Sequence, residues 1–243
     1  MHGIMPQSNK PFNFKQFEVQ QSRSAMKVGT DAVLLAAWTN LNKVRYMLDA
    51  GTGTGVIALI CAQRNQAATI EAIEIDDESA EDARYNFEHS PWSERLKMHE
   101  GDFLKIVSVE KFDLIISNPP YFTSSLRAAN PSRSAARHDD SLPADGFLIQ
   151  CKKLLAPQGR VALIIPTLEF ARWMDAANAS LFQALRICHV FTMADKDTST
   201  RVMLELGIQP TGEPAMESLL IRKGPEEYSG AYKQLTKDFY LKW

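Results

Sequence analysis

Short apolar runs alternate with longer amphipathic stretches along most of the chain. The apolar runs are typical of buried strands and the amphipathic stretches of helices that cover a sheet. The strands are predicted to start at Tyr46, to cover 69–76, to run into Glu100, and to cover 112–117 and 161–165. The helices are predicted after the glycine-rich stretch that follows Tyr46 and at about 78–89, 145–155 and 168–181. This alternation predicts an α/β fold with a doubly wound, mostly parallel sheet.

The two ends of the chain follow other patterns. Residues 185–193 and 201–208 read as two strands joined by the polar stretch 194–200, which predicts a C-terminal antiparallel hairpin, and 219–222 reads as a further edge strand. Residues 31–41 predict an amphipathic helix capped near Thr30 or Asp31. No linker or repeat divides the chain, so we expect a single domain: 1–44 as an N-terminal cap with the first helix, and 45–243 with the catalytic sheet.

Composition narrows the function classes. The net charge of −2 and the pI near 6.2 argue against indiscriminate binding of nucleic acid. Cys61, Cys151 and Cys188 stand in apolar segments without disulfide or metal spacing, which favours reduced core thiols, no metal site and a cytoplasmic location. No apolar stretch approaches the roughly 18 residues of a membrane span, and the N-terminus lacks a signal core, so we expect no membrane contact.

The strongest chemical signal is the end of strand 112–117 on Asn118-Pro119-Pro120-Tyr121. Two prolines stop the strand, because neither has an N–H for the ladder. The Asn118 side-chain oxygen and the Pro119 carbonyl then converge on one NH2 group, while the Tyr121 ring stacks on a flat guest. The plainer alternative is that the prolines only terminate a core strand.

A glycine-rich turn follows the strand that starts at Tyr46. It reads Asp49-Ala-Gly-Thr-Gly-Thr-Gly55 and leads into an apolar helix, an arrangement in which the backbone approaches a ligand closely. A dinucleotide fingerprint would need glycine where the chain has Val56, and no phosphate loop is present. The Asp49 carboxylate near the turn therefore predicts a ligand that carries positive charge.

Acidic residues also end the next two predicted strands. Glu74 lies about 20 residues beyond the glycine turn, where an acidic side chain binds ribose hydroxyls. Asp102 is placed to accept from an adenine amino group, with Phe103 flanking the ring. Each carboxylate alone also fits an ordinary cap or turn. Together they fall at the carboxyl edge of the sheet, where open α/β sheets bind ligands.

These motifs resemble those of the class I S-adenosylmethionine-dependent methyltransferases that carry an Asn-Pro-Pro-Tyr signature for amino-group methylation, over roughly residues 45–165. The resemblance implies a Rossmann-like fold, S-adenosylmethionine as cofactor, and a catalytic group at Asn118, Pro119, Pro120 and Tyr121. It also implies that the glycine turn holds the methionyl end, Glu74 the ribose, and Asp102 and Phe103 the adenine. The implied cofactor contacts are Asp49, Gly51, Thr52, Gly53, Gly55, Glu74, Ile75, Asp102, Phe103, Asn118 and Thr30.

A narrower resemblance covers essentially the whole chain. The stretches 17–21, 26–35, 137–138 and 235–240 look like those of the bacterial tRNA1(Val) adenine-N6 methyltransferase group. This resemblance implies methyl transfer to the N6 of an adenine in tRNA, next to the anticodon of a valine tRNA. We expect a direct transfer that requires neither a metal nor a strong general base, and a monomeric protein.

Basic residues near the predicted acceptor site suit an RNA substrate. Between residues 122 and 138 the chain carries three arginines and no acidic residue, and such groups bind phosphates around a target base. The alternative is a solvated surface loop, and a lone histidine in a loop is more often surface than catalytic. The expected substrate contacts are Phe122, Arg127, Arg133, Arg137, His138 and Lys27.

Two rival functions remain open at this point. The same signature accepts other planar NH2 groups, namely a protein glutamine, a guanine N2 or a DNA adenine. A non-catalytic RNA-binding module that retains the methyl-donor fold is the second alternative.

Overall fold

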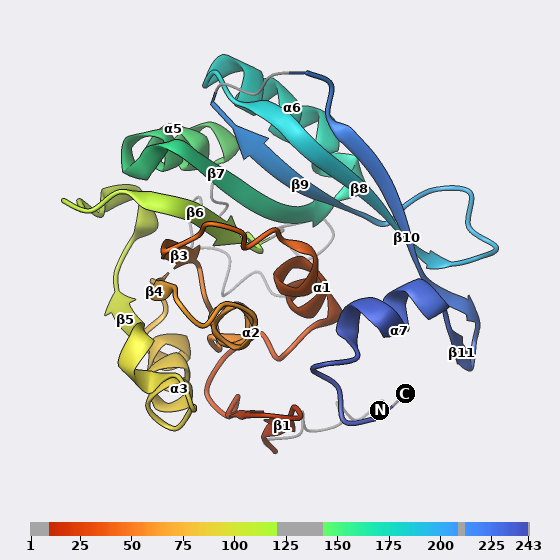
Figure 1. The fold of residues 1–243 in the computed structure, drawn as a ribbon, viewed down its shortest axis with the longest axis horizontal. Helices are drawn as coiled ribbons and strands as arrows, with labels where there is room; N and C mark the ends of the chain where they lie inside the picture. The colour runs from red at the N-terminus through yellow and green to blue at the C-terminus, as the bar shows by residue number, and fades with distance from the viewer. Residues whose placement is uncertain (1–9, 121–142, 209–211, 243) are drawn as a thin grey trace, which may run out of the picture.

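A nine-stranded mixed sheet forms the centre of the molecule (Figure 1). The computed structural model describes residues 10–120, 143–208 and 212–242. The strand order is β11-β10-β8-β9-β7-β6-β3-β4-β5. The strands are β3 (Tyr46–Ala50), β4 (Thr69–Glu74), β5 (Leu96–Glu100), β6 (Phe112–Ser117), β7 (Leu155–Pro166), β8 (Gln183–Met193), β9 (Arg201–Gly207), β10 (Ala215–Gly224) and β11 (Glu227–Tyr228).

Helices cover both faces of this sheet. In the view of Figure 1, α5 and α6 lie above the sheet, and α1, α2 and α7 lie below it. The helices are α1 (Thr30–Trp38), α2 (Val56–Arg64), α3 (Asp77–Glu88), α5 (Ala144–Leu154), α6 (Phe170–Ala179) and α7 (Gly230–Thr236), with short 3-10 turns at Ser93–Arg95, Phe103–Lys105 and Thr167–Glu169. The doubly wound α/β fold expected from the sequence is confirmed.

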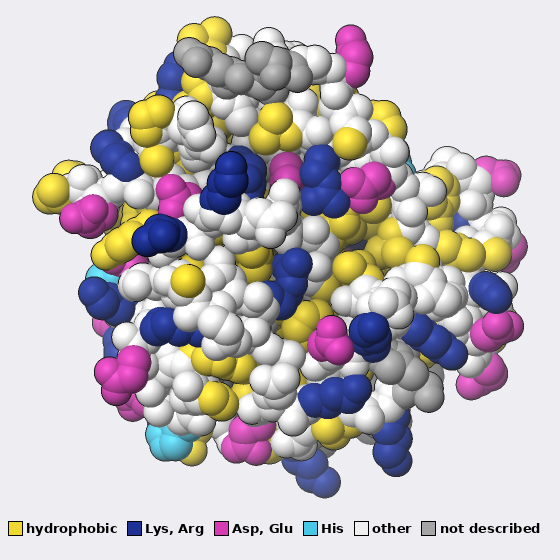
Figure 2. All heavy atoms as spheres, in the orientation of Figure 1, with side chains coloured by type: hydrophobic (Ala, Val, Ile, Leu, Met, Phe, Trp, Pro, Cys, Tyr) yellow, Lys and Arg dark blue, Asp and Glu magenta, His cyan; other side chains and the backbone are white. Residues whose placement is uncertain are grey.

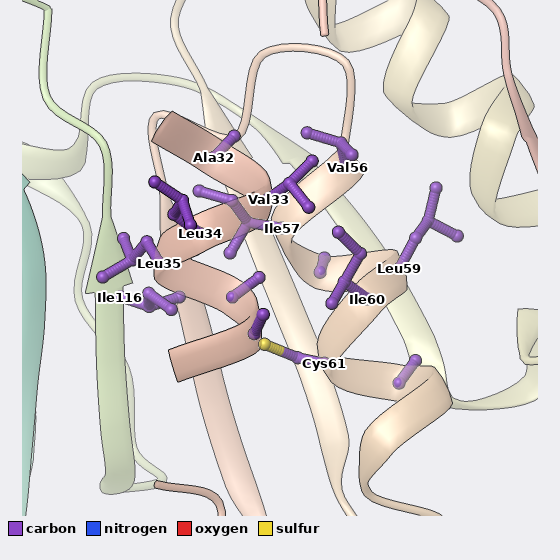
Figure 3. Close-up of a cluster of buried hydrophobic side chains, with 14 of the residues drawn as sticks. Ala32, Val33, Leu34, Leu35, Val56, Ile57, Leu59, Ile60, Cys61 and Ile116 are labelled. Carbon is purple, nitrogen blue, oxygen red and sulfur yellow. The ribbon is translucent and has the colours of Figure 1, made fainter. Parts of the chain in front are cut away.

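Two apolar cores lie on opposite faces of the sheet. One joins α1, α2 and α7 to the sheet, and Figure 3 shows Leu34 and Leu35 of α1 and Ile57 and Ile60 of α2 packed together beside Ile116 of β6. The other core holds α5 and α6 through residues such as Phe147 and Trp173. Because both faces are covered, the central strands are buried along most of their length, which agrees with their continuous apolar sequences.

The prediction for the first helix is wrong in two respects. Helix α1 is buried at every position from Ala32 to Trp38 and is not amphipathic, because α2, α7 and the sheet surround it. Its N-cap is Gly29, with no side-chain capping bond, and Thr30 and Asp31 lie inside the helix.

The antiparallel hairpin is confirmed as β8 and β9, which pair antiparallel with each other. Strand β9 also pairs antiparallel with β7, so the hairpin continues the parallel sheet. The predicted edge strand 219–222 is the longer β10, which pairs parallel with β8, and the two-residue β11 lies outside it. A tight turn at Pro225 and Glu226 connects β10 to β11, so the chain folds back and adds the short strand β11 at the edge of the sheet.

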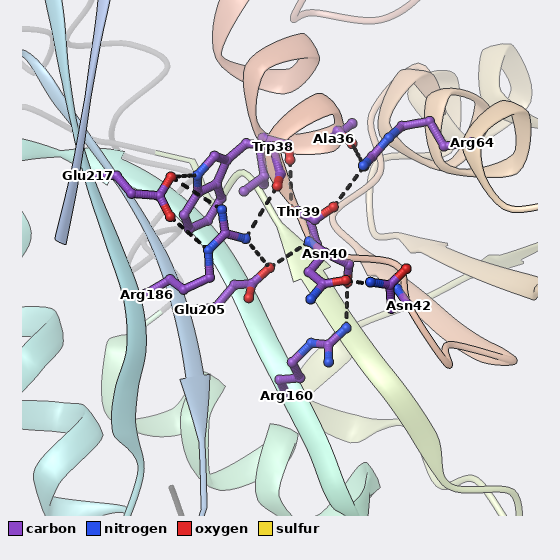
Figure 4. Close-up of polar contacts among 11 residues, drawn as sticks. Ala36, Trp38, Thr39, Asn40, Asn42, Arg64, Arg160, Arg186, Glu205 and Glu217 are labelled. Carbon is purple, nitrogen blue, oxygen red and sulfur yellow. Dashed lines mark hydrogen bonds and ion pairs between the residues drawn. The ribbon is translucent and has the colours of Figure 1, made fainter. Parts of the chain in front are cut away.

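A polar cluster attaches this C-terminal part of the sheet to the end of α1 (Figure 4). The Arg186 guanidinium pairs with Glu217 at 2.9 Å and with the buried Glu205 at 3.3 Å. It also lies 4.1 Å above the Trp38 ring, whose indole N–H donates to Glu217 at 2.8 Å. Charge-assisted bonds of this kind fix the geometry of both elements.

The N-terminal segment before α1 packs against the C-terminal end of the chain. The short strands β1 (Phe12–Asn13) and β2 (Glu18–Val19) form a separate two-stranded sheet. Phe14 forms a bridge with Tyr240, and the Lys15 N–H donates to the Phe239 carbonyl at 2.8 Å.

Cys61, Cys151 and Cys188 are free and buried, as expected. Among the described residues, no helix has the length and apolar character that a membrane span requires. Figure 2 shows acidic and basic side chains interspersed over one face of the molecule.

Candidate active site

The strand order reverses between β3 and β6, and the site is built at this reversal. Neighbouring strands β3 and β6 are parallel, so the glycine turn after β3 and Asn118 after β6 leave the sheet at the same edge. The Ser117 hydroxyl at the end of β6 donates to the Ala50 carbonyl at 2.7 Å, which ties the two strand ends together. A crevice at such a reversal is the usual ligand site of an open α/β sheet.

The glycine turn folds back over the end of β4. The N–H groups of Gly51 and Thr52 donate to the Ile73 carbonyl at 2.9 and 3.1 Å. Gly55 has a φ of 82°, and a Cβ there would lie 2.5 Å from the Phe87 ring, so only glycine fits between the turn and α3. Elsewhere in the turn, Gly51 is exposed and Gly53 is half-buried, so the backbone reaches the surface at these two positions without a side chain to cover it.

Asp49 is fully buried at the end of β3. Its Oδ2 accepts from the Thr52 hydroxyl at 2.6 Å and from the Ala58 N–H at 3.2 Å. Its Oδ1 is buried without a hydrogen-bond partner. Burial raises the pKa of Asp49 from 3.8 to about 7. A buried carboxylate oxygen without a donor is a site that a cation would complete.

Glu74 lies at the end of β4, facing the glycine turn. Its Oε2 accepts from the Gly53 N–H at 2.8 Å, and its Oε1 accepts from the N–H groups of Ile75 and Asp76 at 2.9 and 3.0 Å. A carboxylate has about four acceptor positions, so capacity remains for hydroxyl groups of a ligand. Ile75 beside it is 68% exposed, so its apolar side chain is available for contact with a ligand.

Asp102 caps the turn that follows β5. Its Oδ1 accepts from the Leu104 N–H at 2.9 Å, and its Oδ2 pairs with Lys105 at 3.1 Å. Phe103 is 6% exposed, and its ring lies 4.8 Å from that of Phe147. Phe103 therefore belongs to the core beneath the site and presents little of its ring at the surface.

The predicted acceptor motif is described only in part. Asn118 is half-buried, Pro119 is buried and Pro120 is exposed, all directly beyond β6. The other predicted contacts of this region lie outside the described residues; they are Tyr121, Phe122, Arg127, Arg133, Arg137 and His138.

Two further predicted residues lie in the segment that leads into α1. The Lys27 ammonium donates to the carbonyls of Gln21 and Ser24, so it holds its own loop together. Thr30 is the first residue of α1, and its side chain is exposed. Lys27 thus has structural partners besides the predicted substrate.

The sequence interpretation missed the residues that join this segment to the glycine turn. The buried Asn86 of α3 donates to the carbonyls of Thr54 and Gln20 at 2.9 and 2.8 Å. One turn earlier, Asp82 accepts from the N–H groups of Arg23 and Ser24. The signal in the sequence was a pair of polar residues at i and i+4 within the apolar face of a helix.

The described set fits a ligand with both a cationic group and a nucleoside. Asp49 offers an unpartnered buried oxygen, the glycine turn offers open backbone, and Glu74 and Asp102 offer acceptors along one edge. Among the described residues, no group of three His, Cys, Asp or Glu side chains is placed to hold a metal ion. Hollows of about 640 and 780 Å³ are lined by other residues, around α1, α2 and α7, and share no residue with this edge.

Comparison with known proteins identifies relatives of this chain. Residues 21–174 match the family model described as Methyltransferase small domain. A tRNA1(Val) (adenine(37)-N6)-methyltransferase of Vibrio vulnificus is 41% identical over 233 residues, which cover 96% of both chains. A protein of the same name from Bacteroides thetaiotaomicron is 41% identical over 235 residues, covering 96% of this chain and 98% of that one.

Solved structures show the same fold at lower identity. A predicted O-methyltransferase of Agrobacterium tumefaciens superposes with a TM-score of 0.68 at 20% identity, covering 86% of this chain and 96% of that one. A ribosomal protein L11 methylase of Lactobacillus delbrueckii gives a TM-score of 0.54 at 18% identity, covering 78% and 83%.

Proposed function

The chain belongs to the methyltransferase small-domain family and, at 41% identity over 96% of its length, to the tRNA1(Val) (adenine(37)-N6)-methyltransferases, and from this premise we propose that it methylates the exocyclic N6 of adenine 37 in a valine tRNA. The methyl donor is S-adenosylmethionine, which supplies a methyl group on a positively charged sulfur. The observation that carries the proposal is the meeting of the glycine turn and Asn118 at one sheet edge.

The donor is assigned to the acidic edge of the sheet. Asp49, with its unpartnered Oδ1, balances the positive charge of the methionyl end, and Glu74 accepts from the ribose hydroxyls. Asp102 accepts from the adenine amino group, and the exposed Ile75 side chain packs on the flat base. The glycine turn allows the donor to lie directly on the backbone.

The acceptor is assigned to Asn118 and the residues that follow it. The Asn118 side-chain oxygen and the Pro119 carbonyl accept from the two N–H groups of N6, and Tyr121 stacks on the base. The lone pair of N6 is delocalised into the ring, which makes the nitrogen a weak nucleophile. Two acceptors below it favour a tetrahedral nitrogen, whose lone pair then points away from Asn118 and toward the methyl carbon. The N–C bond forms as the S–C bond of the donor breaks, which leaves S-adenosylhomocysteine, and the cationic methylated N6 then releases one proton to water.

Catalysis by these residues is therefore positioning together with local electrostatics. Orienting two reactants is worth up to roughly 7 to 11 kcal/mol, so the residues that bind the amino group are sufficient without a strong base. The adenine must leave the stack of the anticodon loop, at a cost of a few kcal/mol that an unpaired loop reduces.

The same proposal extends to RNA binding, oligomeric state and cellular location. We assign the RNA phosphates to Arg127, Arg133 and Arg137, with Phe122, His138 and Lys27 beside them. We further propose that the whole chain acts as one catalytic unit, monomeric and cytoplasmic.

The test is methylation of unmodified valine tRNA by the purified protein under single-turnover conditions with saturating donor. We expect m6A at position 37 by nucleoside mass spectrometry, and a loss of at least about 100-fold in rate for Asn118→Ala, because that side chain acts mainly in the transition state. Tyr121→Phe keeps the stacking face and should remain active.

Release factor, ribosomal RNA and duplex DNA serve as competing substrates in the same assay. Faster methylation of any of these would assign the acceptor pocket to a glutamine, a guanine or a DNA adenine instead. Near wild-type rates for Asn118→Ala would show that the two prolines only terminate β6.

A further inference from the structure

Asn86 of α3 forms hydrogen bonds with the glycine turn and with the segment before α1. Its Nδ2 donates to the Thr54 carbonyl at 2.9 Å and to the Gln20 carbonyl at 2.8 Å, and its Oδ1 accepts from the Gln20 N–H at 2.7 Å. The side chain is 3% exposed. Both N–H groups of the amide are thus used, and a reversed amide would direct its oxygen at two carbonyl oxygens. The partners of Asn86 therefore hold it in one orientation.

The bond to Thr54 fixes one peptide group of the glycine turn. Thr54 lies between Gly53 and Gly55, whose φ angles are 56° and 82°. Glycine adopts positive and negative φ about equally readily, so a peptide group beside it can reverse its direction. In this turn the carbonyl of the group accepts from Asn86, and its N–H, which belongs to Gly55, donates to the Thr52 carbonyl at 3.0 Å. The peptide group is therefore bound on both sides.

Helix α3 also packs closely against the turn at this point. The Phe87 ring, next to Asn86 in the chain, is 3% exposed and leaves no room for a Cβ at Gly55. Thr54 itself is 4% exposed, so its carbonyl depends on a donor from the protein. A buried carbonyl that loses its donor is destabilising. Asn86 thus supplies the hydrogen bond that the close approach of α3 makes necessary.

We infer that Asn86 is a positioning residue for the methyl-donor site, acting through its hydrogen bond to the Thr54 carbonyl. The inference deepens the proposed function and rests on it, because that function assigns the donor to the glycine turn. With the bond, the turn presents its backbone to the donor in one conformation. Without the bond, a fraction of the molecules holds the peptide group reversed, and the apparent dissociation constant rises as the competent fraction falls.

The test measures the dissociation constant of S-adenosylhomocysteine by calorimetry in the absence of RNA. This compound keeps the amino acid and the nucleoside of the donor and has no net charge. For Asn86→Ala we expect the dissociation constant to rise about 3- to 10-fold, the effect of one neutral hydrogen bond. The KM for S-adenosylmethionine should rise by the same factor, while kcat at saturating donor should stay within about twofold of wild type. Asn86→Ser, a second variant that keeps a polar group in the buried space, should shift both values in the same direction.

Asp82→Ala is the matched control. Asp82 lies one turn before Asn86 on the same helix, and it is likewise 3% exposed. Its Oδ2 accepts from the N–H groups of Arg23 and Ser24 at 3.0 and 2.8 Å, so both bonds go to the segment before α1. Its replacement should lower the free energy of unfolding, as Asn86→Ala does, and leave the affinity for S-adenosylhomocysteine within about twofold of wild type. The lost charge of Asp82 has little direct effect on a ligand without net charge.

Urea unfolding of the variants shows how much stability each one loses. An equal loss of affinity in Asp82→Ala and Asn86→Ala would mean that stability or the attachment of the N-terminal segment controls donor binding, which would overturn the inference. Unchanged affinity in the folded Asn86 variants would overturn it as well. Failure of the proposed function is separate: wild-type protein would then bind the donor and leave valine tRNA unmethylated, while Asn86→Ala would still weaken donor binding.

Discussion

Asp49 shows how much of the site depends on one buried side chain. Its position before the glycine turn was predictable from the sequence, and a cationic ligand is the sequence's prediction for it. Its unpartnered Oδ1 and its raised pKa were not predictable, because both follow from burial by neighbours distant in sequence. The spacing of the motifs likewise placed Glu74 and Asp102 at the same edge, but the N–H groups that bind their oxygens could only be found in three dimensions.

Donor affinity should depend on pH through Asp49. With a pKa of about 7, the carboxyl is mostly protonated at pH 6 and mostly ionised at pH 7.5, and only the ionised form attracts the donor's ammonium group. We expect the association constant for S-adenosylmethionine to rise roughly tenfold between these pH values, measured by calorimetry. Asp49→Asn, which keeps the shape of the side chain, should bind weakly and with no such rise; a parallel rise in that variant would contradict this assignment.

The same group should make the donor-free protein less stable as the pH rises. Between about pH 4 and pH 7 the folded chain keeps a proton on Asp49 that the unfolded chain has released. The unfolded state then binds fewer protons, so the free energy of unfolding falls with rising pH, by on the order of 4 kcal/mol across this window. Urea unfolding of wild type and Asp49→Asn at several pH values isolates this contribution, since the stability of wild type relative to the variant should fall as the pH rises.

At the scale of elements, the polar cluster in Figure 4 joins α1 to strands β8, β9 and β10 at the edge opposite the candidate active site. Glu205 is 2% exposed and shares the Arg186 guanidinium with Glu217. Removing the partner of a buried carboxylate is strongly destabilising.

Arg186→Met should therefore lower the free energy of unfolding by about 3 kcal/mol, measured in urea. Glu227→Ala is the control: it breaks the exposed pair with Lys223 and should cost less than about 0.5 kcal/mol. Both variants should keep wild-type kcat while folded, because the cluster lies far from Asn118. If the two variants were equally stable, the backbone N–H of Asn40, which donates to Glu205, would be sufficient to stabilise the Glu205 charge without Arg186.

Some helices and strands could be predicted from their own sequences, and others could not. The central strands and the β8–β9 hairpin were predicted because their apolar patterns match their burial. The presence of helix α1 was predicted, but its complete burial was not, because its covering by α7 depends on contacts with residues some 200 positions later in the chain. The parallel pairing of β10 with β8 could not be predicted from the apolar pattern either, because the sequence of one strand does not specify the direction of its neighbour.

At the scale of the whole molecule, charge is mixed. The net charge is −2, and Figure 2 shows no broad field of one sign on the face drawn. We therefore expect tRNA binding to depend on a local group of cations near the predicted acceptor motif, rather than on the charge of the whole chain.

Replacing Arg127, Arg133 and Arg137 together by alanine should thus weaken tRNA binding and lower its salt dependence. Removing one phosphate contact reduces the slope of log K against log salt by about 0.7 to 0.9, so three such contacts correspond to a change of roughly 2 to 3. Filter binding across a salt series measures this slope, and donor affinity should be unchanged. The control replaces three other cations and so makes the same change in net charge; these are Lys43, Arg45 and Lys152.

In the control, Lys43 and Arg45 precede β3 and Lys152 lies in the last turn of α5, all at the edge opposite Asn118. Replacing them should leave the salt slope near that of wild type. Equal slopes for the two triple variants would mean that tRNA responds to net charge alone, and the three arginines after the acceptor motif would then be ordinary surface residues.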